Sequence, residues 1–168
     1  YDPQKNWNRF NIKKSGGNKH HDLMTGDFDN DGSTELVFWN QGAGKLFIAE
    51  IPSKPKKVSE WPSKVVYTYH AASALEPRGG LAAYPVWWGR NEHEGLAKAD
   101  MDGDGLADII GGGRWFKYTG DGQFRPNIID ASNTFTRIAA GQLIEGGRPE
   151  IVLAIGDGKG PLFLYEYS

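Results

Sequence analysis

The chain has 168 residues, including 23 Gly, 9 Pro and no Cys, and its formal net charge is −2. This length suits one domain with a substantial core, and the Gly, Pro and aromatic content favours an all-β protein with many tight turns. The mixed charges argue against nucleic-acid binding, and the lack of a long apolar run argues against a membrane span. The absence of Cys excludes disulfides and thiolate metal sites. Because the chain does not begin with Met, we expect a processed product or a piece of a longer protein.

Three copies of one local pattern follow each other, each opening with a short strand of small residues. In the first copy we expect strands at 22–26, 36–39, 45–51 and 64–70. The second copy repeats the order at 95–99, 109–111, 114–118 and 125–129. The third copy has strands at 137–141, 151–155 and 162–167. Within each copy an acidic or polar loop separates the first two strands, and the third strand is rich in aromatic residues.

The first two copies share an acidic loop of the form Asp-x-Asp-x-Asp-Gly-x-x-acid. Alternate carboxylates on a short turn point into one concavity and repel each other unless a cation lies among them. Oxygen ligands without nitrogen or sulfur favour Ca²⁺, and the Gly permits the positive φ that a chain wrapping an ion needs. The expected ligands are Asp27, Asp29, Asp31 and Glu35 in the first loop and Asp100, Asp102, Asp104 and Asp108 in the second.

These loops begin like an EF-hand, but an EF-hand is excluded. That motif needs a bidentate Glu at its twelfth position, where this chain has Phe38 and Gly111. The third copy keeps its closing acid as Glu150, whereas Gln142 replaces the first aspartate and the other two are also lost. We therefore expect no metal in the third loop.

Such a loop between two short strands, repeated once per unit, resembles the FG-GAP/VCBS repeats of calcium-binding β-propellers. The resemblance implies a single domain over 1–168 that consists of propeller blades, each a four-stranded antiparallel unit. The segment 7–12 looks like the fourth strand of the second copy, so we expect this N-terminal strand to close the last blade. The expected blades cover about 20–70, about 93–130, and about 135–168 together with the outer strand 7–12.

Three blades leave the ring incomplete, because propellers usually close with roughly four to eight. Additional propeller blades from a larger chain are one completion, which we favour slightly. The other is a head-to-tail homodimer in which each N-terminal strand finishes the third blade of its partner. Weak calcium sites fill at the higher calcium concentration outside the cytoplasm, so we expect an extracellular or periplasmic, secreted protein.

A long insert at 71–94 separates the first copy from the second. Because it leads into an inner strand, we expect it at the mouth of the ring, and long loops in compact folds are often functional. Trp87 and Trp88 offer flat apolar faces to a sugar, or else pack the insert onto the blades. Hydrogen-bonding groups for hydroxyls or a uronate carboxylate come from Arg78, Arg90 and Glu92.

Histidines precede the inner strands in register. His20 and His21 precede the strand of the first copy, His93 precedes that of the second, and Thr136 takes the comparable place in the third. Three interpretations stay open: a general base or acid, ligands of a transition metal, or polar caps of the strand ends.

Three classes of function follow from these features. The first is a module that binds carbohydrate at the ring mouth, with contacts from Trp87, Trp88, Arg78, Glu92 and His20. The second is a polysaccharide lyase or sugar dehydratase working by β-elimination, an analogy at the level of the fold. Its expected catalytic residues are His21 or His93 as base, Tyr84 as acid or partner, and Arg90 or Arg78 on the substrate carboxylate. The third is a structural adhesion module without a small ligand.

Overall fold

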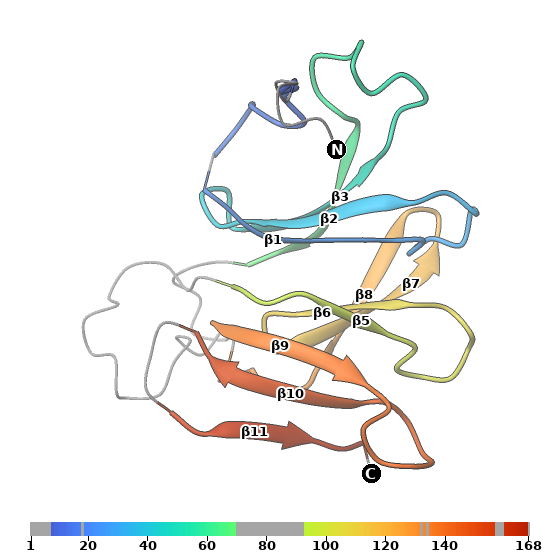
Figure 1. Cartoon of the computed structure of the whole chain (residues 1–168), viewed down its shortest axis with the longest axis vertical. Coiled ribbons are helices and arrows are strands. Elements are labelled where there is room, and N and C mark those ends of the chain that lie inside the picture. The colour runs from blue at the N-terminus through green and yellow to red at the C-terminus, as the bar shows by residue number, and fades with distance from the viewer. Residues whose placement is uncertain are drawn as a thin grey trace, which may run out of the picture.

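The computed structural model describes residues 8–17, 19–69, 93–131, 133, 135–156 and 160–167. Within these residues the chain is all-β, with eleven strands in three antiparallel sheets and no helix. Figure 1 shows the three sheets one after another along the long axis of the molecule. A helix long and apolar enough to cross a membrane is therefore not found in the described part.

All three sheets are simple meanders in which neighbours along the chain pair with each other. The first sheet contains β1 (His20–Gly26), β2 (Glu35–Asn40), β3 (Lys45–Glu50) and β4 (Ser63–Thr68). The second contains β5 (Ala97–Ala99), β6 (Asp108–Gly111), β7 (Arg114–Gly120) and β8 (Gln123–Ile128). The third contains β9 (Thr136–Gly141), β10 (Glu150–Ile155) and β11 (Leu162–Tyr165). The strands predicted within the three copies are present, and their bounds differ from the predicted ones by a few residues at the ends.

The first two strands pair in the same register in all three sheets. The acid that closes each loop lies opposite a small residue, as Glu35 with Gly26, Asp108 with Ala99 and Glu150 with Gly141. Each loop is thus held between the same two strand positions. The three predicted copies are three equivalent structural units.

The described part of the N-terminal segment does not form the outer strand that its sequence predicts. Residues 8–12 form no strand, and the third sheet has three strands among the described residues. The carbonyl of Ile12 accepts a hydrogen bond of 2.8 Å from the backbone N–H of Trp61, in the loop between β3 and β4. Phe10 and Ile12 also line a hollow beside Leu36 and Phe38 of the first sheet.

For these residues the prediction of an outer strand that closes the third sheet is therefore wrong. The apolar side chains at 10 and 12 lie instead on apolar surface of the first sheet, which is near in sequence. The similarity between 7–12 and the second copy's fourth strand reflects an extended apolar pattern, and such a pattern does not specify the partner strand.

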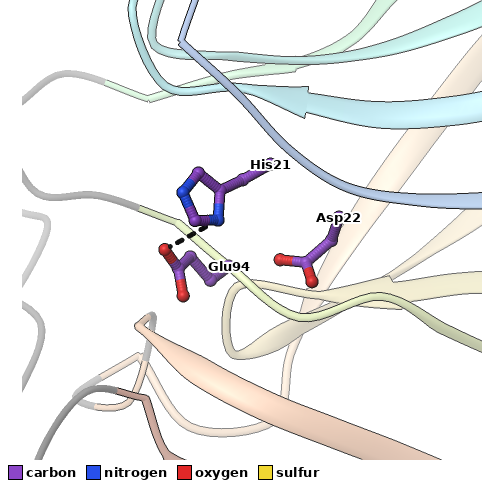
Figure 2. A group of neighbouring side chains, drawn as sticks. All are labelled: His21, Asp22 and Glu94. Atoms are coloured by element: carbon purple, nitrogen blue, oxygen red, sulfur yellow. Dashed lines mark ion pairs between the residues drawn. The ribbon is translucent and has the colours of Figure 1, made fainter.

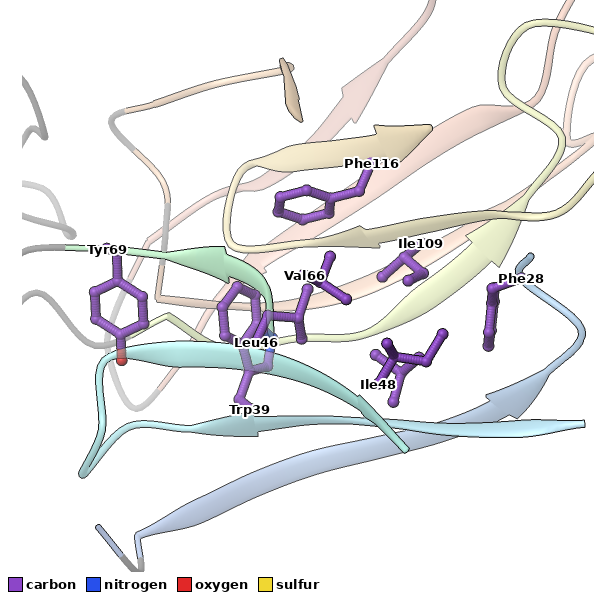
Figure 3. Close-up of a cluster of buried hydrophobic side chains, with 9 residues drawn as sticks. Phe28, Trp39, Leu46, Ile48, Val66, Tyr69, Ile109 and Phe116 are labelled. Carbon is purple, nitrogen blue, oxygen red and sulfur yellow. The ribbon is translucent and has the colours of Figure 1, made fainter. Parts of the chain in front are cut away.

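Two apolar clusters join the sheets. Figure 3 shows the larger one, where Trp39 and Leu46 of the first sheet lie near Ile109 and Phe116 of the second. The Trp39 indole N–H donates to the carbonyl of Gly95, 2.9 Å away. The smaller cluster joins the second and third sheets through Met101, Ile110, Ile151 and Leu153. Strand β5 lies beside β9. Two hydrogen bonds link β1 to the β5 region, from the backbone N–H of Gly95 to Asp22 at 3.0 Å and from Lys98 Nζ to the carbonyl of Thr25 at 2.8 Å. These three strands lie near the centre of the view in Figure 1.

Candidate metal centres and the inner-strand cluster

The first acidic loop gathers four carboxylates between β1 and β2. Its side-chain ligand oxygens, one from each acid, lie within 4.8 Å of one another; they belong to Asp27, Asp29, Asp31 and Glu35. Gly32 has a φ of +83°, in the left-handed region that favours glycine, as its place after the third aspartate predicts. The loop therefore folds into the concave acidic turn expected from the sequence.

Glu35 is the most buried acid of this loop, with none of its surface exposed. One of its oxygens accepts the backbone N–H of Phe28 at 2.8 Å, whereas Oε1 is buried and has no partner. One oxygen each of Asp27 and Asp29 is buried without a partner as well. Burial, with repulsion from the three aspartates, raises the pKa of Glu35 to about 7. A cation among these oxygens would offset both the burial of oxygens without partners and the repulsion between the carboxylates.

The second loop repeats the turn with one difference. Ligand oxygens of Asp100, Asp102 and Asp108 lie within 4.8 Å of one another, and Asp104 is not part of this group. Burial, followed by repulsion from the neighbouring aspartates, raises the pKa of Asp108 to about 6. Lys117 of β7 forms ion pairs with Asp102 and, at 2.6 Å, with Asp104. An ammonium group thus lies beside the second loop.

The third loop satisfies its polar groups differently. Glu150 accepts the backbone N–H groups of Leu143 and Ile144 at 2.8 and 3.0 Å, and these bonds hold the pKa of its carboxyl below the usual range. The side-chain amide of Gln142 donates to the carbonyl of Gly146 at 2.6 Å. An amide group therefore bridges the turn in place of the carboxylates of the other two loops.

A different cluster lies at the ends of the inner strands that are remote from the loops. Figure 2 shows His21, Asp22 and Glu94 pointing toward one another from β1 and from the segment before β5. The Nδ1 of His21 is 3.1 Å from Oε1 of Glu94, whose side chain is buried. Arg137 of β9 pairs with the other oxygen of Glu94. All three sheets therefore contribute to one polar group.

A β-bulge explains how Asp22 reaches this cluster. The pairing of β1 with β2 shifts between His21 and Leu23, and Asp22 has a φ of +38°. Bulges redirect a side chain that regular alternation would send to the opposite face. An oxygen of Asp22 accepts the backbone N–H of Gly95 at 3.0 Å, which holds the carboxylate in place.

The predicted histidines have three different environments. His21 is half-buried at the cluster, and His20 packs edge-on against Phe38 with ring centres 5.5 Å apart. His93 has no exposed surface and stacks on Tyr69 with ring centres 4.0 Å apart. A Cβ at Gly112 would come within 2.4 Å of the His93 ring, so this glycine permits the close approach. The surroundings of His93 favour the scaffold interpretation over the catalytic one.

Residues 71–92 of the insert predicted at 71–94 lie outside the described part of the chain, and six predicted site residues are among them. They are Arg78, Tyr84, Trp87, Trp88, Arg90 and Glu92.

Sequence reasoning missed four residues that contact the cluster or belong to it, namely Asp22, Gln41, Glu94 and Arg137. Alignment of the three copies could have indicated two of them, because Asp22 and Arg137 both stand four residues before the small residue that pairs with the closing acid.

None of the protein-family models, curated proteins and solved structures compared with this chain matches it. The resemblance to FG-GAP/VCBS repeats therefore stays a prediction, which rests on the two acidic loops and the repeated strand order.

Proposed function

We propose that this chain is a calcium-stabilised β-propeller repeat module, in which each sheet is one blade. Its support is the equivalence of the three units, which share a meander, a loop position and a register. The contact of β5 with β9, and the hydrogen bonds that link β1 to the β5 region, are what inner strands around a propeller axis would have.

The observation that carries the calcium proposal is Glu35. A buried carboxylate oxygen without a partner, among three further carboxylates, is unfavourable in the absence of a cation. The donor set consists of carboxylate oxygens on a flexible turn, which suits the larger and less geometrically demanding Ca²⁺ better than Mg²⁺. The ion would hold the first hairpin of each of the first two blades and would have a structural role.

Completion of the ring belongs to the same proposal. Since the described N-terminal residues lie on the first sheet, the third blade would obtain a fourth strand from elsewhere. Further blades of a larger protein or a second copy of this chain would both provide one. The secreted location stays a prediction from the calcium loops.

Calcium titration with thermal unfolding tests the proposal, using Glu35→Gln and Glu150→Gln as a matched pair. The first variant keeps an acceptor for the N–H of Phe28 but loses the charge, so we expect the first calcium site to be lost. Glu150→Gln makes the same change in the third loop and should leave calcium stoichiometry unchanged. For the wild type we expect stabilisation of about 2.7 kcal/mol per site at 100 times Kd. A melting temperature and a calorimetric titration that are both insensitive to Ca²⁺ would refute the proposal.

Carbohydrate binding and β-elimination stay predictions from the sequence, because the tryptophans and arginines expected to make the contacts lie outside the described residues. Their expected location is the end of the inner strands, where an imidazole, carboxylates and a guanidinium already meet.

A further inference from the structure

Equivalent positions of the three repeats meet where the inner strands begin. In each repeat one small residue pairs with the closing acid of the loop. Five positions before that small residue stand His21 in the first repeat, Glu94 in the second and Thr136 in the third. In the next position along the chain stand Asp22, Gly95 and Arg137. Repetition places these residues around one point, so a few side chains from distant parts of the sequence form a compact group.

The atoms of this group are spaced as metal ligands are. Ligand atoms of His21, Asp22 and Glu94 all lie within 4.8 Å of one another, and His21 Nδ1 is 3.1 Å from Glu94 Oε1. A metal with bonds of about 2.1 Å holds its ligand atoms roughly 3 to 4 Å apart. Small side-chain rotations would bring all three atoms onto one ion.

A second observation comes from Gln41, whose side chain lies against the group. Its Nε2 donates to Glu94 Oε1 at 3.0 Å, and the residue is 2% exposed. Its Oε1 is buried and has no partner. The buried hydroxyl of Thr136, at the third equivalent position, has no partner either. Buried oxygens without donors are rare, and a cation nearby would satisfy such an atom.

The donor set differs in chemistry from the two acidic loops. It combines an imidazole nitrogen with two carboxylates, and nitrogen ligands favour transition metals over Ca²⁺. Arg137 pairs with the Glu94 oxygen that does not face His21, so the guanidinium would hold this ligand from its outer side. His21 keeps 36% of its side chain exposed, which leaves the group open to solvent.

We infer that His21, Asp22 and Glu94 bind one divalent transition-metal ion, of the class of Zn²⁺, Mn²⁺ and Co²⁺, at the convergence of the inner strands. This site is separate from the proposed calcium loops and does not depend on them. A metal there would tie the first sheet to the second through protein ligands. Its open side would face whatever ligand enters the mouth.

Cobalt titration of the calcium-saturated protein tests the inference, because excess Ca²⁺ occupies the acidic loops and bound Co²⁺ absorbs visible light. The variants are His21→Ala and His20→Ala, which remove neighbouring imidazoles from the same strand. Loss of an outer partner of a metal site typically costs about 10- to 100-fold in affinity, so loss of the ligand His21 should cost at least that much. His20→Ala should bind Co²⁺ as the wild type does.

Equal cobalt affinity in the wild type and His21→Ala, or a wild-type spectrum identical to that of aqueous Co²⁺, would overturn the inference. That result would leave the cluster as a hydrogen-bonded His–Glu pair. If His21→Ala fails to fold by circular dichroism, Asp22→Asn makes the same test and should also weaken binding. A protein that binds Co²⁺ through His21 but is insensitive to Ca²⁺ would refute the proposed function and support this site.

Discussion

Glu35 and Glu150 occupy the same position in two repeats, yet their surroundings shift their pKa values in opposite directions. Glu35 lies among three aspartates with one orphaned oxygen, and its pKa is raised to about 7, chiefly by burial. Glu150 accepts two backbone N–H groups, which lower its pKa. The neighbours of the residue, rather than its type or position, decide whether the carboxylate needs a cation.

This contrast predicts a specific pH dependence. Without calcium, folded Glu35 holds a proton up to about pH 7, whereas the unfolded chain releases it near the ordinary value of 4.5. The folded state therefore binds more protons in this range, and its free energy of unfolding falls as pH rises through that window. Calcium replaces the proton, so the gain in melting temperature on adding Ca²⁺ should grow from about pH 5 to about pH 8. Thermal unfolding with calcium or with a chelator measures both trends.

Glu35→Gln serves as the control for this pH effect. Its amide does not titrate, so the slope contributed by Glu35 should disappear from the chelated protein, while that contributed by Asp108 remains. A calcium effect that is constant across this pH range in the wild type would contradict the coupling.

At the scale of strands, one position on the third strand of a sheet distinguishes the two acidic loops. Glu50 of β3 pairs with Glu35, which adds negative charge beside the first loop. In β7, Lys117 follows Phe116 and forms ion pairs with two aspartates of the second loop. The lysine competes with a bound cation, so we expect the second loop to bind Ca²⁺ more weakly than the first.

Removing this lysine charge should strengthen the weaker site. Repulsion between the ammonium group and a divalent cation opposes calcium binding, so Lys117→Gln should raise calcium affinity at the second loop severalfold. Lys45→Gln is the matched control, because Lys45 pairs with Asn40 at the end of the sheet away from the loop. Isothermal titration calorimetry resolves the two sites, and identical affinities in Lys117→Gln and the wild type would contradict the argument.

At the scale of the whole molecule, Trp39 connects the first two sheets. It has no exposed surface and donates its indole N–H to the Gly95 carbonyl, in the segment leading into β5. Trp39→Phe would leave that carbonyl without its donor and would leave space in the larger cluster. We expect the free energy of unfolding to fall by about 1 to 3 kcal/mol.

Urea denaturation measures this effect, with Trp61→Phe as the control. Trp61 is only partly buried, and its N–H reaches the carbonyl of Pro55 at a long 3.5 Å. If the free energy of unfolding falls equally in both variants, Trp39 does not stabilise the contact between the first two sheets in the way argued.

The sequence alone determined the strand order and the acidic loops, because turn chemistry and strand patterns act over a few neighbouring residues. The glycine after the third aspartate has the expected positive φ, and each closing acid lies in the expected place. Only the tertiary structure decided which distant residues meet. It placed His21 beside Glu94, buried His93 and laid residues 8–12 on the first sheet. These outcomes depend on a bulge and on packing between sheets, whose contacts join residues far apart in the chain and leave no local pattern.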